Sequence, residues 1–355
     1  MNQAVRIGVL GAGTWGIALS RMLQRSGKQV TVWSALPEEI DRLAATRRHP
    51  NLPGMEIPEA VAFTKSMEEA CCGQDILLFA VPSVFVRRTA AAAAPYVRQD
   101  QIIVDVAKGI EPDTLMSMTD VIDDALRQAG AAPARLVALS GPTHAEEVAL
   151  DLPTTIVSAS RDAEAAGRVQ EIFMNTCMRV YTNSDVLGVE LCGALKNIIA
   201  LAAGISVGLG YGDNARAAII TRGLSEIRRL GIRMGCREET FAGLAGVGDL
   251  IVTATSRHSR NNRAGELIGR GATAEEAKRE VGMVVEGLNA LPAAMALAHR
   301  YDVEMPIVFA VDSVVSGRRK AGEAVQALME RKRRDETADH GYELATESSL
   351  LAGLD

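Results

Sequence analysis

The sequence predicts an α/β fold, in which a doubly wound sheet is followed by an all-α C-terminal domain. In the first half of the chain, short apolar runs rich in β-branched residues alternate with helical patterns. This alternation is typical of a mostly parallel sheet with helices on both faces. After about residue 187 the strand-like runs disappear and helical patterns continue alone. We therefore expect two domains, residues 1–187 and 188–334, and a flexible tail over residues 335–355.

The first predicted strand, VRIGVL, is followed by a helical pattern that ends at Gly27 and then by the second strand, QVTVW. Together they form one βαβ unit of about 30 residues. Further strands are expected at residues 75–81, 101–107, 135–141, 153–160 and 178–182, with helices between them at residues 66–73, 87–97 and 114–130. In the second half, helices are expected at residues 188–210, 220–234, 261–271, 272–282, 287–301 and 321–334.

Composition limits the function classes. The chain has 355 residues, 48% hydrophobic and 23% charged, with a net charge of −6, which argues against nucleic acid as the main partner. Its five cysteines are scattered and lack the spacing of a zinc site, so we expect free thiols, no metal and a cytoplasmic location. The first strand starts too early for a signal peptide. The longest apolar run, residues 198–210, is too short to span a membrane.

Three glycines follow the first predicted strand in the spacing G-x-G-x-x-G. Gly11 would allow a tight turn, Gly13 would let the backbone approach a pyrophosphate, and Gly16 would let helix and strand pack closely. Because a strand precedes them and a helix follows, we expect a Rossmann-like dinucleotide site rather than a glycine turn that binds nothing. Trp15 either covers the cofactor or fills an edge of the core, and spacing does not decide between the two.

The second predicted strand ends in Trp33-Ser-Ala-Leu-Pro37, where an NAD-specific site carries an Asp or Glu for the ribose 2′-hydroxyl. Within these residues no acid would repel a 2′-phosphate and no arginine would bind one. Arg47 and Arg48 follow later and could reach a phosphate, although arginine pairs after a helix are usually solvated. This pattern favours acceptance of NADPH.

Other candidates lie where predicted strands end, because ligands bind at the carboxyl ends of parallel strands. Val81-Pro-Ser83 follows one strand, and Lys108 follows another. Lys108 can hold an anion or polarise a carbonyl; the alternative is a surface lysine before a glycine turn. His144 offers acid–base chemistry, but Gly141-Pro-Thr143 beside it favours a wall of backbone around a pocket.

Lys196 lies within a long apolar helical pattern, CGALKNIIA. Burial of an ammonium group is costly unless the group is paired or its pKa falls. A lysine with a pKa near neutrality is a good general acid for a carbonyl oxygen that receives a hydride at its carbon. The alternative is that Lys196 extends its ammonium group to the surface.

A polar stretch follows at residues 246–261. Asp249 and Thr253 are four residues apart and share one helix face. Ser259 can cap the next helix, whose free N–H groups would face an anion together with Arg260 and Asn261. The alternative is a plain serine cap beside solvated arginines.

A series of short motifs runs in order from residue 7 to about residue 330. They are GAGTWG (11–16), VPS (81–83), AKGIE (107–111), SGPTHAEEV (140–148), GVELCGALKNIIA (188–200), GDNARAAIITRG (212–223), GLAGVGDLIVT (243–253), SRN (259–261), VVEG (284–287) and EMPI (304–307). The set closely resembles the bacterial NAD(P)-dependent glycerol-3-phosphate dehydrogenases. The resemblance implies reversible reduction of dihydroxyacetone phosphate to sn-glycerol 3-phosphate, the backbone precursor of phospholipids. We also expect a homodimer.

The resemblance also implies roles for single residues. Lys196 would give the proton to the substrate oxygen and accept it in reverse, and Asp249 would orient the substrate or Lys196. Substrate contacts would come from Lys108, Gly141, Thr143, Lys196, Asp249, Ser259, Arg260 and Asn261. Nucleotide contacts would come from Gly11, Gly13, Thr14, Trp15, Gly16, Lys108, Ala145, Arg260, Val284 and Glu286.

The sequence departs from the family pattern at Ala35, where an Arg or His is common. One alternative function is a related two-domain enzyme, such as a β-hydroxyacid dehydrogenase or ketopantoate reductase, which would not need Ser259-Arg260-Asn261 beside the helix of Asp249. A second alternative is a non-catalytic nucleotide-binding sensor, which would be expected to lack Lys196.

Overall fold

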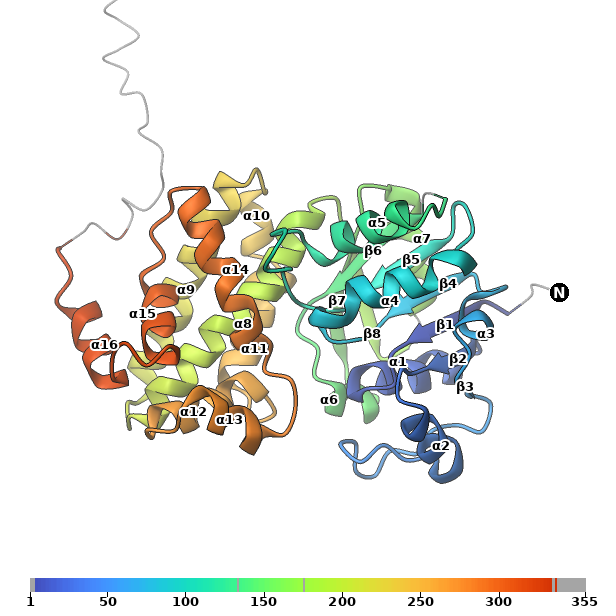
Figure 1. Cartoon of the computed structure of the whole chain (residues 1–355), viewed down its shortest axis with the longest axis horizontal. Helices are drawn as coiled ribbons and strands as arrows, with labels where there is room; N and C mark the ends of the chain where they lie inside the picture. The colour runs from blue at the N-terminus through green and yellow to red at the C-terminus, as the bar shows by residue number, and fades with distance from the viewer. Residues whose placement is uncertain (1–3, 133, 175, 334–335, 337–355) are drawn as a thin grey trace, which may run out of the picture.

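The computed structural model describes residues 4–132, 134–174, 176–333 and 336. An α/β half lies beside a helical half (Figure 1), so the predicted fold class is confirmed. The last strand ends at Asn183 and the next helix begins at Val186. The domain division at residue 187 stays a prediction. The predicted tail lies outside the described residues except for residue 336.

The described strands form one eight-stranded sheet in the order β3-β2-β1-β4-β5-β6-β7-β8. Neighbouring strands are parallel except β6 and β7, which run antiparallel. Strand β3 was not predicted, because its three residues are too few to show an alternating pattern. The strands are β1 (Arg6–Leu10), β2 (Gln29–Trp33), β3 (Ala62–Thr64), β4 (Ile76–Phe79), β5 (Ile102–Asp105), β6 (Arg135–Ser140), β7 (Thr154–Ala159) and β8 (Met178–Asn183).

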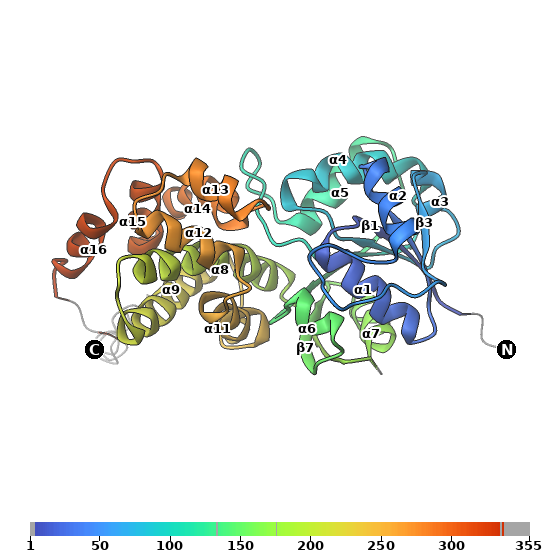
Figure 2. The same ribbon diagram turned by 90° about the horizontal axis from the view of Figure 1, so that it is seen from below.

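Both faces of the sheet are buried. In β4, Ile76 and Leu78 join one core cluster, whereas Leu77 and Phe79 join another on the opposite face. Helices α1, α6 and α7 cover the first face, and α4 and α5 cover the second (Figure 2). The helices of this half are α1 (Thr14–Arg25), α2 (Pro37–Thr46), α3 (Met67–Cys71), α4 (Val86–Ala93), α5 (Met118–Gln128), α6 (Ala145–Ala149) and α7 (Ala163–Phe173).

The register of the sheet brings the ends of several strands to one edge. Leu10 pairs with Trp33 on one side and with Phe79 on the other, and Phe79 pairs with Asp105. Asp105 in turn pairs with Ala138 in β6. The loops that follow these strands carry the glycine motif, the VPS motif, Lys108 and the SGPTH motif. The sheet therefore places four of the sequence motifs along a single edge.

A 23-residue helix, α8 (Val186–Gly208), runs through the centre of the second half and contacts α9, α11, α12 and α14. The apolar run that begins at residue 198 forms the second half of this helix, and the buried Glu190 and Lys196 lie in its first half. By length and composition α8 could cross a membrane, but 94% of its most apolar 18-residue window is buried inside the protein. It is a core helix.

Helix α12 lies against α8 at a distance that only glycines permit. A Cβ on Gly265 would lie 2.1 Å from the carbonyl oxygen of Leu201, and one on Gly204 would lie 2.0 Å from that of Asn262. The polar start of α12 is thereby held next to α8. The other helices of this half are α9 (Asp213–Arg233), α10 (Glu238–Phe241), α11 (Asp249–Thr255), α12 (Arg260–Gly269), α13 (Ala274–Val281), α14 (Glu286–Arg300), α15 (Pro306–Val315) and α16 (Ala321–Met329).

Candidate active site

The glycine loop after β1 has the geometry of a phosphate-binding turn. Gly11 has φ +124°, and a Cβ there would lie 2.6 Å from the carbonyl oxygen of Ala80. A Cβ on Gly16 would lie 2.2 Å from the carbonyl oxygen of Gly11, whereas one on Gly13 would meet no atom within 4 Å. Helix α1 begins here with no side-chain cap and no acidic residue in its first turn. Packing within the protein does not require a glycine at position 13, because there is free space beside it. A diphosphate that approaches the backbone closely would require one, so the loop suits a diphosphate.

The residues after the glycine loop link the two halves of the molecule. Trp15 is partly buried and packs against the core of the sheet, which supports the interpretation that it fills an edge of that core. The Oγ1 of Thr14 accepts a hydrogen bond from Asn51 Nδ2 at 3.5 Å. The same amide nitrogen lies 3.7 Å from the sulfur of Met283, in the loop before α14. Ala145 is buried at the start of α6.

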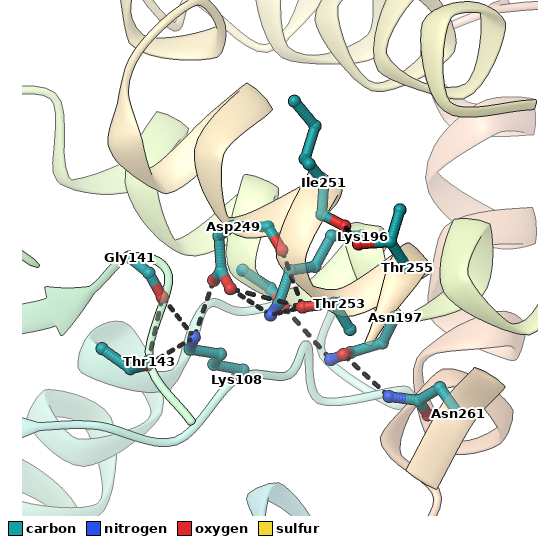
Figure 3. A network of polar contacts seen from close by, with 11 residues as sticks. Lys108, Gly141, Thr143, Lys196, Asn197, Asp249, Ile251, Thr253, Thr255 and Asn261 are labelled. Carbon is teal, nitrogen blue, oxygen red and sulfur yellow. Dashed lines mark hydrogen bonds and ion pairs between the residues drawn. The ribbon is translucent and has the colours of Figure 1, made fainter. Parts of the chain in front are cut away.

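Lys196 is buried in the middle of α8, with 5% of its surface exposed, so its ammonium group does not extend to the surface. Its Nζ donates hydrogen bonds to Asp249 Oδ1 and, at 2.5 Å, to Thr253 Oγ1 (Figure 3). The Thr253 hydroxyl donates in turn to the backbone oxygen of Asp249 at 2.7 Å. Asp249 and Thr253 thus share one helix face, as the sequence predicted, and that face is turned toward Lys196.

Lys108 meets the same carboxylate from the other side. Its Nζ donates to Asp249 Oδ2 at 2.6 Å, to the carbonyl oxygen of Gly141 at 3.0 Å and to Thr143 Oγ1 at 3.3 Å. The buried Asp249 carboxylate therefore lies between the side-chain nitrogens of two lysines (Figure 3). Lys108 is not a plain surface lysine.

A small residue on α8 makes room for Lys108. A Cβ on Gly193 would lie 3.1 Å from Ser140 Oγ and 3.5 Å from Lys108 Cγ. Gly193 is one helical turn before Lys196, so the stem of Lys108 crosses α8 directly beside the buried lysine. The sequence analysis did not single out Gly193, although it lies within the motif that contains Lys196.

Burial lowers the pKa of Lys196 from 10.5 to about 7. Loss of hydration is the largest cause; the negative charge of Asp249 raises the pKa, and the positive charge of Lys108 lowers it. A group with this pKa is present in both protonation states near neutral pH. It can therefore give or take a proton with little change in free energy.

Asp249 is positioned by an irregular turn. The chain forms a π-helical turn over Leu244–Gly248 directly before α11, a feature that often occurs at functional sites. A Cβ on Gly246 would lie 2.1 Å from the carbonyl oxygen of Phe241, so the turn requires glycine there. The turn places Asp249 in the first turn of α11 with 1% of its surface exposed.

The start of α12 matches the predicted anion site only in part. Ser259 caps the helix, since its Oγ accepts from the Asn262 N–H at 3.2 Å. Arg260 is exposed and forms no ion pair within the described residues. Asn261, in contrast, is buried: its Nδ2 donates to Asn197 Oδ1 at 2.9 Å, and its Oδ1 accepts from the Gly287 N–H at 2.8 Å. The Asn261 side chain joins α8 to α14 and does not point away from the fold.

Glu286 connects α14 to the loop after β4. Its carboxylate accepts from the Ser83 N–H at 3.1 Å and from the Ser83 hydroxyl at 2.6 Å. Val284, two residues earlier, is partly buried in the same connection. The VPS and VVEG motifs are therefore in direct contact, although they are about 200 residues apart in the sequence.

His144 is held in the wall beside this site. Burial lowers the pKa of the imidazole, and a hydrogen bond to the backbone of Val252 opposes that effect. The Nε2 atom is buried and has no hydrogen-bond partner within the described residues. The ring lies 5.9 Å from that of His258. These contacts favour a neutral wall residue, the interpretation that Gly141-Pro-Thr143 had suggested.

The end of β2 receives a carboxylate from α2. Ala35 is exposed, but the Oε2 of Glu39 accepts a hydrogen bond from Ser34 Oγ at 2.6 Å. A carboxylate is therefore fixed to the first residue after β2. Residues 33–37 hold no acid, as the sequence shows, but Glu39 in the first turn of α2 adds one from outside that stretch.

Family models match both halves of the chain. The model for the N-terminus of NAD-dependent glycerol-3-phosphate dehydrogenase matches residues 6–166, and the model for its C-terminus matches residues 185–326. A glycerol-3-phosphate dehydrogenase [NAD(P)+] of Lactobacillus delbrueckii subsp. bulgaricus is 66% identical over 93% of this chain and 98% of its own length. One from Agathobacter rectalis is 52% identical over 93% and 97%.

Solved structures agree. Glycerol-3-phosphate dehydrogenase from Coxiella burnetii superposes with a TM-score of 0.88 and 36% identity, over 92% of this chain and 99% of that one. A ketopantoate reductase from Ralstonia eutropha has a TM-score of 0.58 and 17% identity over 91% of this chain and 100% of that one, which shows a shared fold only. The chain belongs to the NAD-dependent glycerol-3-phosphate dehydrogenase family.

Proposed function

We propose that this protein interconverts dihydroxyacetone phosphate and sn-glycerol 3-phosphate with NADH or NADPH and so supplies glycerophospholipid synthesis. The names of its relatives support this activity. The observation that carries it is the buried Lys196, whose pKa is about 7 and whose Nζ is fixed by Asp249. A sensor that only binds nucleotide has no need for a buried lysine tuned to neutrality.

The substrate would be held by positive charge. When Lys196 is protonated, as reduction requires, the two lysines Lys108 and Lys196 outnumber the single carboxylate of Asp249, and this favours an anionic ligand. The first N–H groups of α12 have no partner within the helix, and with Ser259 and the exposed Arg260 they form the proposed phosphate site. Gly141 and Thr143 would line the pocket next to Lys108, and Asn261 would contribute by fixing the start of α12 against α8.

Lys196 would be the catalytic acid. The nicotinamide, when bound, supplies the hydride that adds to the carbonyl carbon of dihydroxyacetone phosphate. Lys196 gives a proton from Nζ to the carbonyl oxygen as negative charge develops there, which leaves neutral Lys196 and the secondary alcohol. Asp249 and Thr253 fix the position of Nζ, and in the reverse direction the neutral amine takes the proton of the alcohol.

The cofactor would lie along the sheet edge. Gly11, Gly13 and Gly16 form the turn for the diphosphate, because position 13 is open while positions 11 and 16 are tightly packed. The remaining proposed cofactor contacts are Thr14, Trp15, Lys108, Ala145, Arg260, Val284 and Glu286.

The assay is the oxidation of NADH, and separately of NADPH, after addition of dihydroxyacetone phosphate to the purified full chain. We expect loss of absorbance at the nicotinamide band with stoichiometric formation of sn-glycerol 3-phosphate. Ketopantoate serves as the matched carboxylate substrate. Turnover with ketopantoate and none with dihydroxyacetone phosphate would contradict the proposal and favour the related reductases.

The domain division at residue 187, the homodimer and the cytoplasmic location are part of the same proposal. Limited proteolysis would test the division, because cleavage should concentrate near residues 184–185, between β8 and α8. Light scattering of the purified chain would give the mass of the particle, for which twice 37.7 kDa is expected. Cell fractionation would test the location.

A further inference from the structure

A carboxylate is fixed at the carboxyl end of β2. The Ser34 hydroxyl donates to Glu39 Oε2 at 2.6 Å and accepts from the Leu36 N–H at 3.2 Å. Ser34 has 8% of its surface exposed, so this arrangement is held within the fold. Glu39 belongs to the first turn of α2, five residues beyond the hydroxyl that it binds. The first turn of α2 thus places an acidic side chain at the end of β2.

This strand end lies directly beside the glycine loop. The Gly11 N–H donates to the carbonyl oxygen of Trp33, the last residue of β2, at 2.8 Å. In dinucleotide-binding sheets the adenosine ribose lies at the end of the second strand, where an acid accepts the 2′-hydroxyl and repels a 2′-phosphate. That acid usually stands within the residues after the strand, where this chain has Ala35. Here Glu39, bound to Ser34, brings a carboxylate to the end of β2 from the helix instead.

The arginine that could have favoured a 2′-phosphate is occupied elsewhere. Arg47 Nη1 donates to the carbonyl oxygen of Val61 at 2.7 Å, and its Nε lies 3.6 Å from the Glu59 carboxylate. Its guanidinium also lies over the ring of Phe63, 5.1 Å from the centroid. These contacts hold Arg47 against the β3 edge. Arg48 is exposed and forms no ion pair within the described part of the chain. It is therefore an arginine that could bind the 2′-phosphate of NADPH, and its substitution belongs to the test.

We propose that Glu39, held by Ser34, determines cofactor specificity and makes this enzyme prefer NADH to NADPH. The Glu39 carboxylate accepts the ribose 2′-hydroxyl of NADH, and it repels the doubly charged phosphate that NADPH carries at that position. Ser34 is a positioning residue that directs the carboxylate. This inference rests on the proposed dehydrogenase activity, and it reverses the preference that residues 33–37 alone had indicated.

The test measures kcat/KM for NADH and NADPH with saturating dihydroxyacetone phosphate. The wild-type enzyme is expected to prefer NADH by about tenfold or more, the size expected from one unfavourable charge contact. Glu39→Gln should lower that preference about tenfold, mainly by improving kcat/KM for NADPH. Ser34→Ala should shift the ratio in the same direction by less. Glu38→Gln is the matched control, because Glu38 is the exposed neighbouring acid on the same helix turn, and its ratio should stay within about twofold.

Binding gives a second measurement that does not depend on turnover. The dissociation constants of NADH and NADPH, measured by nucleotide fluorescence, should show the same change in ratio for Glu39→Gln. A wild-type preference for NADPH would overturn the inference, and loss of that preference in Arg48→Ala would then identify Arg48 as the phosphate contact. A lower melting temperature in Glu39→Gln with an unchanged cofactor ratio would also overturn it, since Glu39 would then only cap α2. Normal cofactor binding without turnover of dihydroxyacetone phosphate would instead contradict the proposed function.

Discussion

The glycine loop and the Lys196 cluster contribute to one site but are built by different means. The loop depends on backbone conformation and on missing Cβ atoms within a few residues of sequence. The cluster depends on charged side chains from the loop after β5, from α8 and from α11, which meet only after the two halves pack together. The first is sensitive to added volume and the second to altered charge. Substitutions that add volume or remove charge should therefore separate cofactor binding from catalysis.

The largest effect is expected for Lys196→Ala. Removal of the proton donor should lower kcat for dihydroxyacetone phosphate by about 10²–10⁴-fold, the usual contribution of general acid catalysis. NADH binding, followed by fluorescence, should stay near the wild-type value because the glycine loop is untouched. Lys278→Ala, a partly exposed lysine on α13, is the control. If the Lys196→Ala variant retained the wild-type kcat, Lys196 would not be the proton donor.

Gly16→Ala and Gly13→Ala should separate fold stability from cofactor binding. The Cβ added at position 16 would lie 2.2 Å from a backbone oxygen, so the melting temperature should fall clearly. The Cβ added at position 13 would meet no protein atom within 4 Å, so the melting temperature of that variant should be close to that of the wild type. Gly13→Ala should nevertheless weaken NADH binding by about tenfold, because the methyl group would occupy the approach of the diphosphate. An unchanged NADH affinity in Gly13→Ala would show that the diphosphate does not bind against Gly13.

The sequence predicted local features well. Strand β1, the glycine spacing and the start of α1 lie within twenty residues and need no tertiary contact to be recognised. The buried position of Lys196 could also be predicted, because a helix that is apolar on every side is itself buried and takes the lysine with it. Its partner Asp249 could be assigned only by family resemblance, since 53 residues separate the two.

Arg260→Ala should chiefly raise the KM for dihydroxyacetone phosphate, by about tenfold, the size of one charge-assisted hydrogen bond. The effect should diminish at high salt, because Arg260 is exposed and its charge is screened. Arg263→Ala, an exposed arginine further along α12, controls for the general loss of positive charge. Equal KM values for the two variants would show that the substrate phosphate does not bind at the start of α12.

The contacts that the sequence did not reveal join residues far apart in the chain. Asn261 was expected to face an anion, which stays a prediction, and the sequence did not reveal its hydrogen bond to the amide of Asn197 on α8. Glu286 binds Ser83, 203 residues away. Glu39 is near Ser34 in sequence, yet its contact depends on the direction in which α2 begins. Periodicity predicts which face of a helix is buried, but it does not predict which polar partner that face meets.

The smallest effects are shifts in pH dependence. Lys108 lowers the pKa of Lys196 and Asp249 raises it. The pH at which reduction of dihydroxyacetone phosphate loses activity should therefore rise in Lys108→Met and fall in Asp249→Asn. The pH profile of kcat/KM is followed, because its midpoint reports the pKa of the ligand-free enzyme, to which these shifts refer. Shifts in the same direction for both variants would mean that Lys196 is not the titrating group.

The most direct test of the central claim is the pH dependence of kcat/KM in both directions for the wild-type enzyme, because kcat/KM reports the pKa of the ligand-free enzyme. Reduction requires protonated Lys196 and oxidation requires the neutral amine, whose pKa is about 7. We expect kcat/KM for reduction of dihydroxyacetone phosphate to fall as the pH rises through about 7, while kcat/KM for oxidation of sn-glycerol 3-phosphate rises over the same interval. A value of kcat/KM for reduction that stays constant between about pH 6 and pH 9 would contradict the assignment of Lys196 as the proton donor.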